Sequence, residues 1–228
     1  MAPVPQLPFS FAFESTARFD SFRTEPDNLA LLHQLETSAH RRGQLTWLWG
    51  EPGAGKSHLL QAFCHLHRQA IYLPVGKMLD YEPDSLAALL DSELLVLDDI
   101  ELLAGKPAWE EQLFALCRQL LATDGALVCA AVSAPAQAGF ALADLRSRLQ
   151  LALVYQVHAL GDDGKQTVLM ERAKARGIEL KDEVAQFIMA RHPRNLHDLM
   201  AVLEQLDRQA LAEQRRLTIP FVKTALGW

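Results

Sequence analysis

Short apolar segments alternate with longer amphipathic ones from residue 45 to residue 160. The apolar segments are rich in leucine, β-branched and aromatic residues, and they cover residues 45–50, 70–75, 94–100, 126–132 and 151–157. Strands that are separated by helix-length crossovers pair in parallel, and helices cover both faces of the resulting sheet. We therefore expect an α/β body over residues 19–160 with a five-stranded, mostly parallel sheet.

The pattern changes after Leu160, where apolar residues recur with the period of a helix. Four helical segments are expected, at residues 161–177, 180–192, 195–214 and 219–227. The longest carries an i, i+3, i+4 stripe that predicts one buried face, formed by Leu196, Leu199, Val202, Leu203 and Leu206. The expected organisation is thus a tail at residues 1–18, the α/β body, and a small all-helical lid domain at residues 161–228.

Composition limits the classes of partner. The chain has 228 residues, of which 50% are hydrophobic, so it can bury a full core. Its net charge is -6, and no global positive field is available to attract a phosphate backbone. Three cysteines lie in apolar runs without metal-ligand spacing, which indicates buried thiols of a reducing compartment. With no apolar run of about 18 residues and no signal-peptide start, we expect a soluble, cytoplasmic protein that does not enter a membrane.

A phosphate-binding motif follows the first predicted strand. Residues 50–57 read G-x-x-x-x-G-K-S, and a helical segment comes directly after them. The glycines let backbone N–H groups surround a phosphate, Lys56 reaches the β- and γ-phosphates, and Ser57 ligates Mg²⁺. The alternative is a plain glycine-rich turn. The expected nucleotide-binding set is Gly50, Pro52, Gly53, Ala54, Gly55, Lys56, Ser57 and His58.

Two acids end the third predicted strand. Four apolar residues at 94–97 lead into Asp98 and Asp99, and a buried parallel strand delivers such carboxylates to its carboxyl end. Asp98 is expected to hold Mg²⁺, and Asp99 to orient the attacking water. An acidic turn after a core strand is the alternative, and the phosphate-loop motif favours the nucleotide site.

A pair of arginines precedes the fifth predicted strand. Arg146 and Arg148 are spaced i, i+2, so they lie on different sides of a helix and are not expected to share one partner. An arginine offered to another molecule's γ-phosphate stabilises the transition state of phosphoryl transfer. From spacing alone, a solvated basic face or a surface salt bridge is the more common explanation of such a pair.

Together these motifs resemble the DnaA branch of the AAA+ ATPases, a P-loop NTPase fold with a helical lid. The resemblance extends over nearly the whole chain: Phe19, Phe22 and Asn28 match residues that open the DnaA-type nucleotide pocket. LEQLDR and LTIPFVK near the end resemble the short regulatory homologues of DnaA. DnaA proteins continue into a DNA-binding domain, whereas this chain ends at Trp228, so sequence-specific DNA binding is not expected.

The resemblance implies a negative regulator of replication initiation. In such homologues the nucleotide-bound protein docks on the DNA-loaded sliding clamp, the β subunit of DNA polymerase III, and stimulates hydrolysis of DnaA-bound ATP. Arg148 matches the family's arginine finger, which acts in trans on the nucleotide of DnaA. A homo-oligomer is also compatible with this family.

Two positions depart from the family pattern. Ala131 and Val132 stand where the fourth strand normally ends in a polar residue that senses the γ-phosphate, and Ser133 is a partial replacement. In the lid, His197 stands where an arginine normally reaches the phosphates, and Arg194 lies one turn earlier as a compensating cation or as a plain surface residue. We expect bound ADP or ATP with Mg²⁺ and only weak intrinsic hydrolysis, which Asp99 keeps possible.

Two other functions remain open at this stage. One is an active ATPase of helicase-loader or initiator type that acts on nucleic acid, which the Asp98–Asp99 pair favours and the net charge of -6 disfavours. The other is a small nucleotide kinase, but the helical segment after Gly161 does not resemble a phosphate-acceptor site.

The first residues contain an apolar pattern of their own. Gln6, Leu7, Phe9 and Phe11 resemble the Q-L-x-L-x-L peptides that bind the sliding clamp, with phenylalanine in place of leucine. The alternative is an edge strand over Phe9–Phe13, since apolar residues alternate there with small or polar ones.

Overall fold

The computed structural model describes residues 17–37, 43–191 and 195–228, which form two compact units. The first unit ends at His158. The second runs from Ala159 to Trp228 and also takes in Pro52–Ala54. The predicted tail lies almost entirely outside the described residues.

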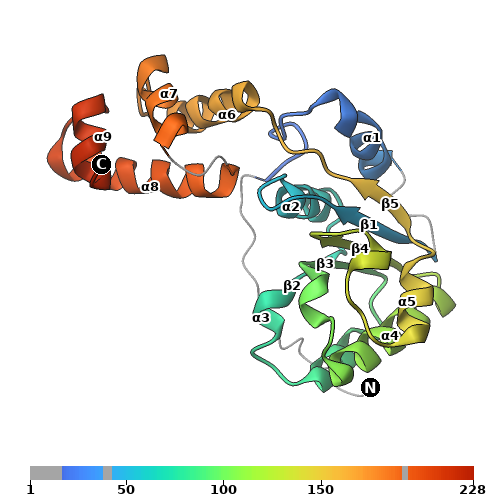
Figure 1. Ribbon diagram of the computed structural model, residues 1–228. Helices are drawn as coiled ribbons and strands as arrows, with labels where there is room; N and C mark the ends of the chain where they lie inside the picture. The colour runs from blue at the N-terminus through green and yellow to red at the C-terminus, as the bar shows by residue number, and fades with distance from the viewer. Residues whose placement is uncertain (1–16, 38–42, 192–194) are drawn as a thin grey trace. The chain divides into compact units, whose positions relative to one another are not determined.

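The first unit is built on a five-stranded parallel sheet, as predicted (Figure 1). Its strands, in chain order, are β1 Leu45–Trp49, β2 Ile71–Pro74, β3 Leu94–Asp98, β4 Ala126–Ala131 and β5 Leu153–Gln156. They are arranged in the order β2-β3-β4-β1-β5, and every pair is parallel. All residues of β3 and β4 are buried, which explains why both read as continuous apolar runs.

Helices cover both faces of this sheet (Figure 1). They are α1 Leu29–Thr37, α2 Lys56–Leu66, α3 Val75–Met78, α4 Pro107–Ala122 and α5 Ala143–Leu149. Leu45 and Trp47 of β1 pack into a core that α3, α4 and α5 share. Because strand side chains alternate between faces, Leu48 is buried on the opposite face, the side that α2 covers.

The second unit is all-helical, as predicted for the lid. It contains α6 Asp162–Ala175, α7 Asp182–Arg191, α8 Leu196–Glu213 and α9 Ile219–Leu226. The predicted stripe on α8 is buried at Leu199, Val202, Leu203 and Leu206, whereas Leu196, the first helical residue, is only partly buried. Asn195 and Thr218 cap α8 and α9 by accepting hydrogen bonds from the backbone N–H groups of Asp198 and Phe221.

The predicted buried thiols are confirmed. Cys64, Cys117 and Cys129 are free and buried, and burial raises the pKa of Cys64 and of Cys117 to about 12. A thiol with such a pKa carries almost no thiolate at neutral pH and is a poor nucleophile. Within the described parts of the chain, none of the helices has the length and apolar content needed to cross a bilayer.

Replacing Leu203 by alanine should destabilise the lid strongly. Leu203 is 0% exposed in the lid core, whereas Leu211 on the same helix is 79% exposed. We expect Leu203→Ala to cost about 2–5 kcal/mol of unfolding free energy in urea titrations. Leu211→Ala is the matched control, with an expected change within about 0.5 kcal/mol. Equal effects of the two substitutions would contradict the assignment of this face to the core.

Candidate nucleotide site

The phosphate loop lies between the end of β1 and the start of α2. Gly53 and Gly55 take φ values of 80° and 94°, which side-chain-bearing residues rarely adopt. Gly50 is required for space, because a Cβ there would lie 2.4 Å from the carbonyl oxygen of Val157, next to β5. A Cβ on Gly55 would lie 2.7 Å from the ring of Phe22. The loop is therefore a close-packed backbone feature rather than a loose turn.

Lys56 is held inside this loop. Its Nζ donates hydrogen bonds to the carbonyl oxygens of Gly50 at 2.8 Å and Glu51 at 3.1 Å, and the residue is only 6% exposed. Ser57 follows it on the first turn of α2 and is exposed. A cation and a hydroxyl at the start of a helix that follows a glycine loop fit the β- and γ-phosphates and the Mg²⁺ of a nucleotide.

Asp98 is buried at the carboxyl end of β3, and only one of its two carboxylate oxygens accepts a hydrogen bond from a described residue. The residue is 3% exposed, and its Oδ2 accepts a hydrogen bond from the hydroxyl of Tyr72 at 2.7 Å. Burial and the charge of Asp98 raise the pKa of Tyr72, so the phenol stays a donor. Oδ1 is buried and has no hydrogen-bond partner among the described residues. Such an oxygen fits a divalent cation, because a buried carboxylate oxygen is costly unless it is paired.

Asp99 adopts a left-handed backbone conformation with φ of 57°, directly before the short 3-10 helix Ile100–Leu103. Burial, the charge of Asp98 and the charge of Glu101 raise the pKa of Asp99 to about 6, while Lys56 opposes the shift. The group therefore takes up a proton near neutral pH. That property suits a residue which orients or deprotonates a water molecule.

Glu101 joins these acids, although the sequence motifs did not single it out. Its Oε1 accepts a hydrogen bond from the backbone N–H of Val132 at 3.1 Å, and its Oε2 is buried without a hydrogen-bond partner in the described residues. The side chain of Val132 is apolar and 45% exposed, so the polar group held next to the end of β4, where we expected a sensor, is the carboxylate of Glu101. The only sequence signal was the position of Glu101 two residues after Asp99.

Ser133, through its backbone carbonyl, and Asn28, through its side chain, form hydrogen bonds that connect distant parts of the first unit. The carbonyl oxygen of Ser133 accepts a hydrogen bond from Trp47 Nε1 at 2.9 Å. The Asn28 side chain exchanges two hydrogen bonds of 2.9 Å with the backbone of His158, one as donor and one as acceptor. Asn28 thereby ties the segment before α1 to the chain beyond β5.

His58 contacts the segment before α1. Its Nε2 lies 2.9 Å from the carbonyl oxygen of Arg18 and 3.3 Å from Ser21 Oγ, and its ring is 5.8 Å from that of Phe22. The sequence placed His58 in the nucleotide-binding set. In the structure it connects the start of α2 to this segment.

The two arginines of α5 differ in exposure. Arg146 is exposed, whereas Arg148 is partly buried, and its positive charge lies near Cys117 of α4. Leu145 and Leu149 anchor the face of this short helix that lies between the two arginines in the core. Neither arginine forms a salt bridge with another residue in the described ranges.

Comparison with known proteins identifies the family. Residues 162–226 match the model of the family described as "Hda, lid domain". An uncharacterized protein of Haemophilus influenzae is 36% identical over 97% of this chain and 98% of its own length. Domain III of the replication initiation protein DnaA from Thermotoga maritima shares the fold, with a TM-score of 0.82 and 20% identity over 95% of this chain and 98% of that one. The chain belongs to the Hda-like, DnaA-homologous AAA+ proteins.

A second solved structure supports the same fold. The AMPPCP-bound DnaA of Aquifex aeolicus has a TM-score of 0.71 and 18% identity, over 88% of this chain and 67% of its own. The Hda-like protein therefore has the AAA+ architecture with a helical lid.

The lid of this Hda-like protein supplies one described candidate residue. His197 is exposed on the first turn of α8. Arg194 lies outside the described residues, as do the four residues expected to bind the clamp, Gln6, Leu7, Phe9 and Phe11.

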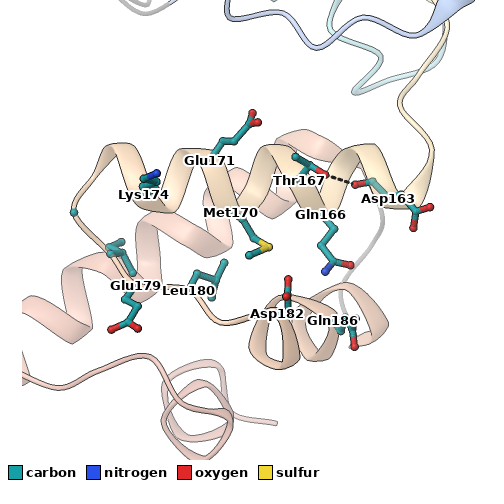
Figure 2. Close-up of a pocket in the computed structure, with 12 residues that line it drawn as sticks. Asp163, Gln166, Thr167, Met170, Glu171, Lys174, Glu179, Leu180, Asp182 and Gln186 are labelled. Atoms are coloured by element: carbon teal, nitrogen blue, oxygen red, sulfur yellow. Dashed lines mark hydrogen bonds between the residues drawn. The ribbon is translucent and has the colours of Figure 1, made fainter.

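The Hda-like lid also contains a groove of about 830 Å³ between α6, α7 and the turn that joins them (Figure 2). Met170, Ile178 and Leu180 supply apolar lining. Its charged lining residues are Asp163, Glu171, Lys174, Glu179 and Asp182. Four carboxylates against one ammonium group make this groove a poor site for a phosphate.

Replacing Asp99 by asparagine should change how stability depends on pH. The folded pKa of Asp99, about 6, lies above its ordinary value of 3.8, so the native state loses stability as pH rises through this window. Without nucleotide, we expect Asp99→Asn to become progressively more stable than the wild type between about pH 4 and pH 7, measured by urea unfolding.

Asp124→Asn is the matched control, since Asp124 has a similar φ of 59° but lies at the opposite end of β4. Asparagine tolerates this backbone conformation well, and the control measures the effect of an Asp-to-Asn change at a similar φ away from Asp98 and Glu101. A difference between Asp99→Asn and wild type that stays constant with pH would contradict the raised pKa of Asp99, which burial and the charges of Asp98 and Glu101 cause together.

Proposed function

We propose that this Hda-like protein is a nucleotide-bound negative regulator of replication initiation. Docked on the DNA-loaded sliding clamp, it stimulates hydrolysis of ATP bound to DnaA. The observation that carries the proposal is the match of residues 162–226 to the Hda lid, on a chain whose phosphate loop and Lys56 have an intact arrangement.

The nucleotide is ADP or ATP, held by the loop of residues 50–57. A DnaA structure of the same fold binds the nucleotide analogue AMPPCP, which supports this assignment. Lys56 would turn from the carbonyl oxygens of Gly50 and Glu51 to the phosphates. Asp98 Oδ1 and Ser57 are the residues suited to hold Mg²⁺, which when bound offsets phosphate charge. Tyr72 fixes the orientation of the Asp98 carboxylate, a contact of the kind that tunes metal affinity.

Intrinsic hydrolysis should be weak. Hydrolysis needs donors that strengthen their contacts as charge develops on the γ-phosphate, and losing one typically costs ~10²–10³ in rate. Here the end of β4 offers the apolar side chain of Val132, and its N–H group is already bonded to Glu101. The bound nucleotide then acts mainly as a structural element.

Arg148 is the residue proposed to act on DnaA. An arginine supplied in trans stabilises charge on the transferring phosphoryl group and is worth about 10³–10⁵ in rate. The buried Leu145 and Leu149 fix α5 in the core, and a fixed helix presents an arginine at a defined position. Arg146, two residues away, offers the same charge in another direction.

The decisive test compares these two arginines. With DnaA, ATP and clamp-loaded DNA present, we expect Arg148→Ala to lose at least ~10³-fold in stimulated hydrolysis, as expected for an arginine finger. Arg146→Ala serves as the matched substitution on the same helix and should retain most of the stimulation. If Arg146→Ala loses activity and Arg148→Ala keeps it, the assignment within the pair is wrong. If neither loses activity, the arginine-finger assignment is wrong, whereas a wild-type protein that does not stimulate hydrolysis would refute the proposed function.

An active ATPase of helicase-loader or initiator type is the second candidate. Two neighbouring acids favour this candidate. Asp98 has a buried oxygen without a hydrogen-bond partner among the described residues, and Asp99 has a pKa of about 6. These are the groups that ATP hydrolysis would use to hold Mg²⁺ and to orient water. Robust ATP turnover by the purified protein without DnaA would favour this candidate over the regulator.

Clamp binding is expected to depend on the first residues. Gln6→Ala combined with Leu7→Ala should abolish binding to the clamp, because the glutamine amide and the apolar anchor are the groups such peptides use. Nucleotide binding should stay intact. Pro3→Ala with Pro5→Ala is a control of equal size in the same segment. Surface plasmon resonance on immobilised clamp gives the affinity, and undiminished binding of the Gln6–Leu7 variant would refute the motif.

A further inference from the structure

A second buried carboxylate lies outside the nucleotide site. Glu110 on the first turn of α4 is 1% exposed, although most glutamates lie at the surface. An ionised carboxylate in such a place is costly unless hydrogen bonds compensate for the lost water. Its partners therefore indicate what it does.

Within the part of the chain that the structure describes, the hydrogen bonds that the Glu110 carboxylate accepts all come from backbone N–H groups. Oε1 accepts from Gly105 at 2.7 Å and Ala141 at 3.0 Å, and Oε2 accepts from Ala141 at 2.9 Å and Leu142 at 2.6 Å. Ala141 and Leu142 are the two residues directly before α5. The carboxylate thus joins the start of α4 to the start of the helix that carries Arg146 and Arg148.

This connection matters because α5 is short. It has seven residues, and its N-cap residue, Leu142, provides no side-chain cap. Leu145 and Leu149 hold one face in the core, and Glu110 holds the backbone at the entry to the helix. Without the carboxylate, apolar packing would still hold the helix against the core, but the entry would lose its hydrogen bonds.

The charge state of Glu110 agrees with this role. Burial acts against the charged form, but the N–H groups of Ala141, Leu142 and Gly105, with the positive charge of Arg146, together lower the pKa below its ordinary value. Glu110 is therefore ionised at neutral pH, where both oxygens accept hydrogen bonds.

We propose that Glu110 is a positioning residue for the arginine finger: it fixes the entry of α5, and thereby the place that Arg148 reaches in the partner's nucleotide site. The inference rests on the proposed function. Catalytic groups must be placed closely, and a misplacement of about 1 Å costs ~10²-fold in rate.

Glu110→Gln tests the inference. Glutamine keeps one acceptor oxygen and replaces the other by an NH₂ group, which cannot accept the N–H of Leu142 or Ala141. With DnaA, ATP and clamp-loaded DNA, we expect a ~10–100-fold fall in the maximal stimulated rate. The protein concentration giving half-maximal stimulation, and the affinity of this chain for its own nucleotide, should stay at wild-type values. Glu111→Gln, at an exposed neighbouring position, is the matched control and should behave as wild type.

A double mutant separates positioning from general destabilisation. If Glu110 acts only through Arg148, adding Glu110→Gln to Arg148→Ala should cause no further loss. A further loss of the same size as in the wild-type background would overturn the inference. The inference would also be overturned if Arg148→Ala lost its stimulation while Glu110→Gln kept the wild-type maximal rate. That result would leave the proposed function intact. Unchanged stimulation by Arg148→Ala would instead overturn the arginine-finger assignment, and the inference with it.

Leu142→Pro provides a second variant if Glu110→Gln does not fold. The φ of Leu142 is -67°, a value that proline takes, and proline lacks the N–H that Glu110 accepts. The same fall in maximal rate at unchanged half-maximal concentration is expected, and wild-type stimulation by this variant would contradict the inference.

Discussion

The chemistry of the first unit depends on the parallel direction of its central strands. β4 lies between β1 and β3, and all three end at the same edge of the sheet. The phosphate loop that follows β1 and the acids that end β3 therefore flank the end of β4 (Figure 1). An antiparallel strand at either place would put the loop and Asp98 at opposite ends of the sheet, and neither alone forms a nucleotide site.

This edge concentrates negative charge, which the fold balances only in part. Asp98, Asp99 and Glu101 lie close enough for their charges to raise the pKa of Asp99. The Tyr72 hydroxyl, the Val132 N–H and the charge of Lys56 compensate for some of it. Asp98 Oδ1 and Glu101 Oε2 have no hydrogen-bond partner within the described residues, and such carboxylate oxygens favour a cation over a free anion.

The two buried acids of the first unit show how a binding group differs from a structural one. Glu110 has backbone N–H donors on both oxygens, so it has no capacity left for a ligand. Asp98 has a donor on one oxygen only. Sequence reasoning identified Asp98, because it ends a strand beside a phosphate-loop motif. It did not identify Glu110, which stands in an ordinary amphipathic helix.

The sequence by itself determined the five strands, the helical lid and the phosphate loop, because hydrophobic period and contiguous motifs are local properties. Only the tertiary structure decided which polar atoms are hydrogen-bonded within the protein and which remain able to contact a ligand. Three hydrogen-bonded pairs illustrate this: Tyr72 and Asp98 are 26 residues apart in the sequence, Glu101 and Val132 are 31 apart, and Glu110 and Leu142 are 32 apart. No local pattern encodes such pairs, since they arise when strand order and helix packing bring distant backbone and side chains together.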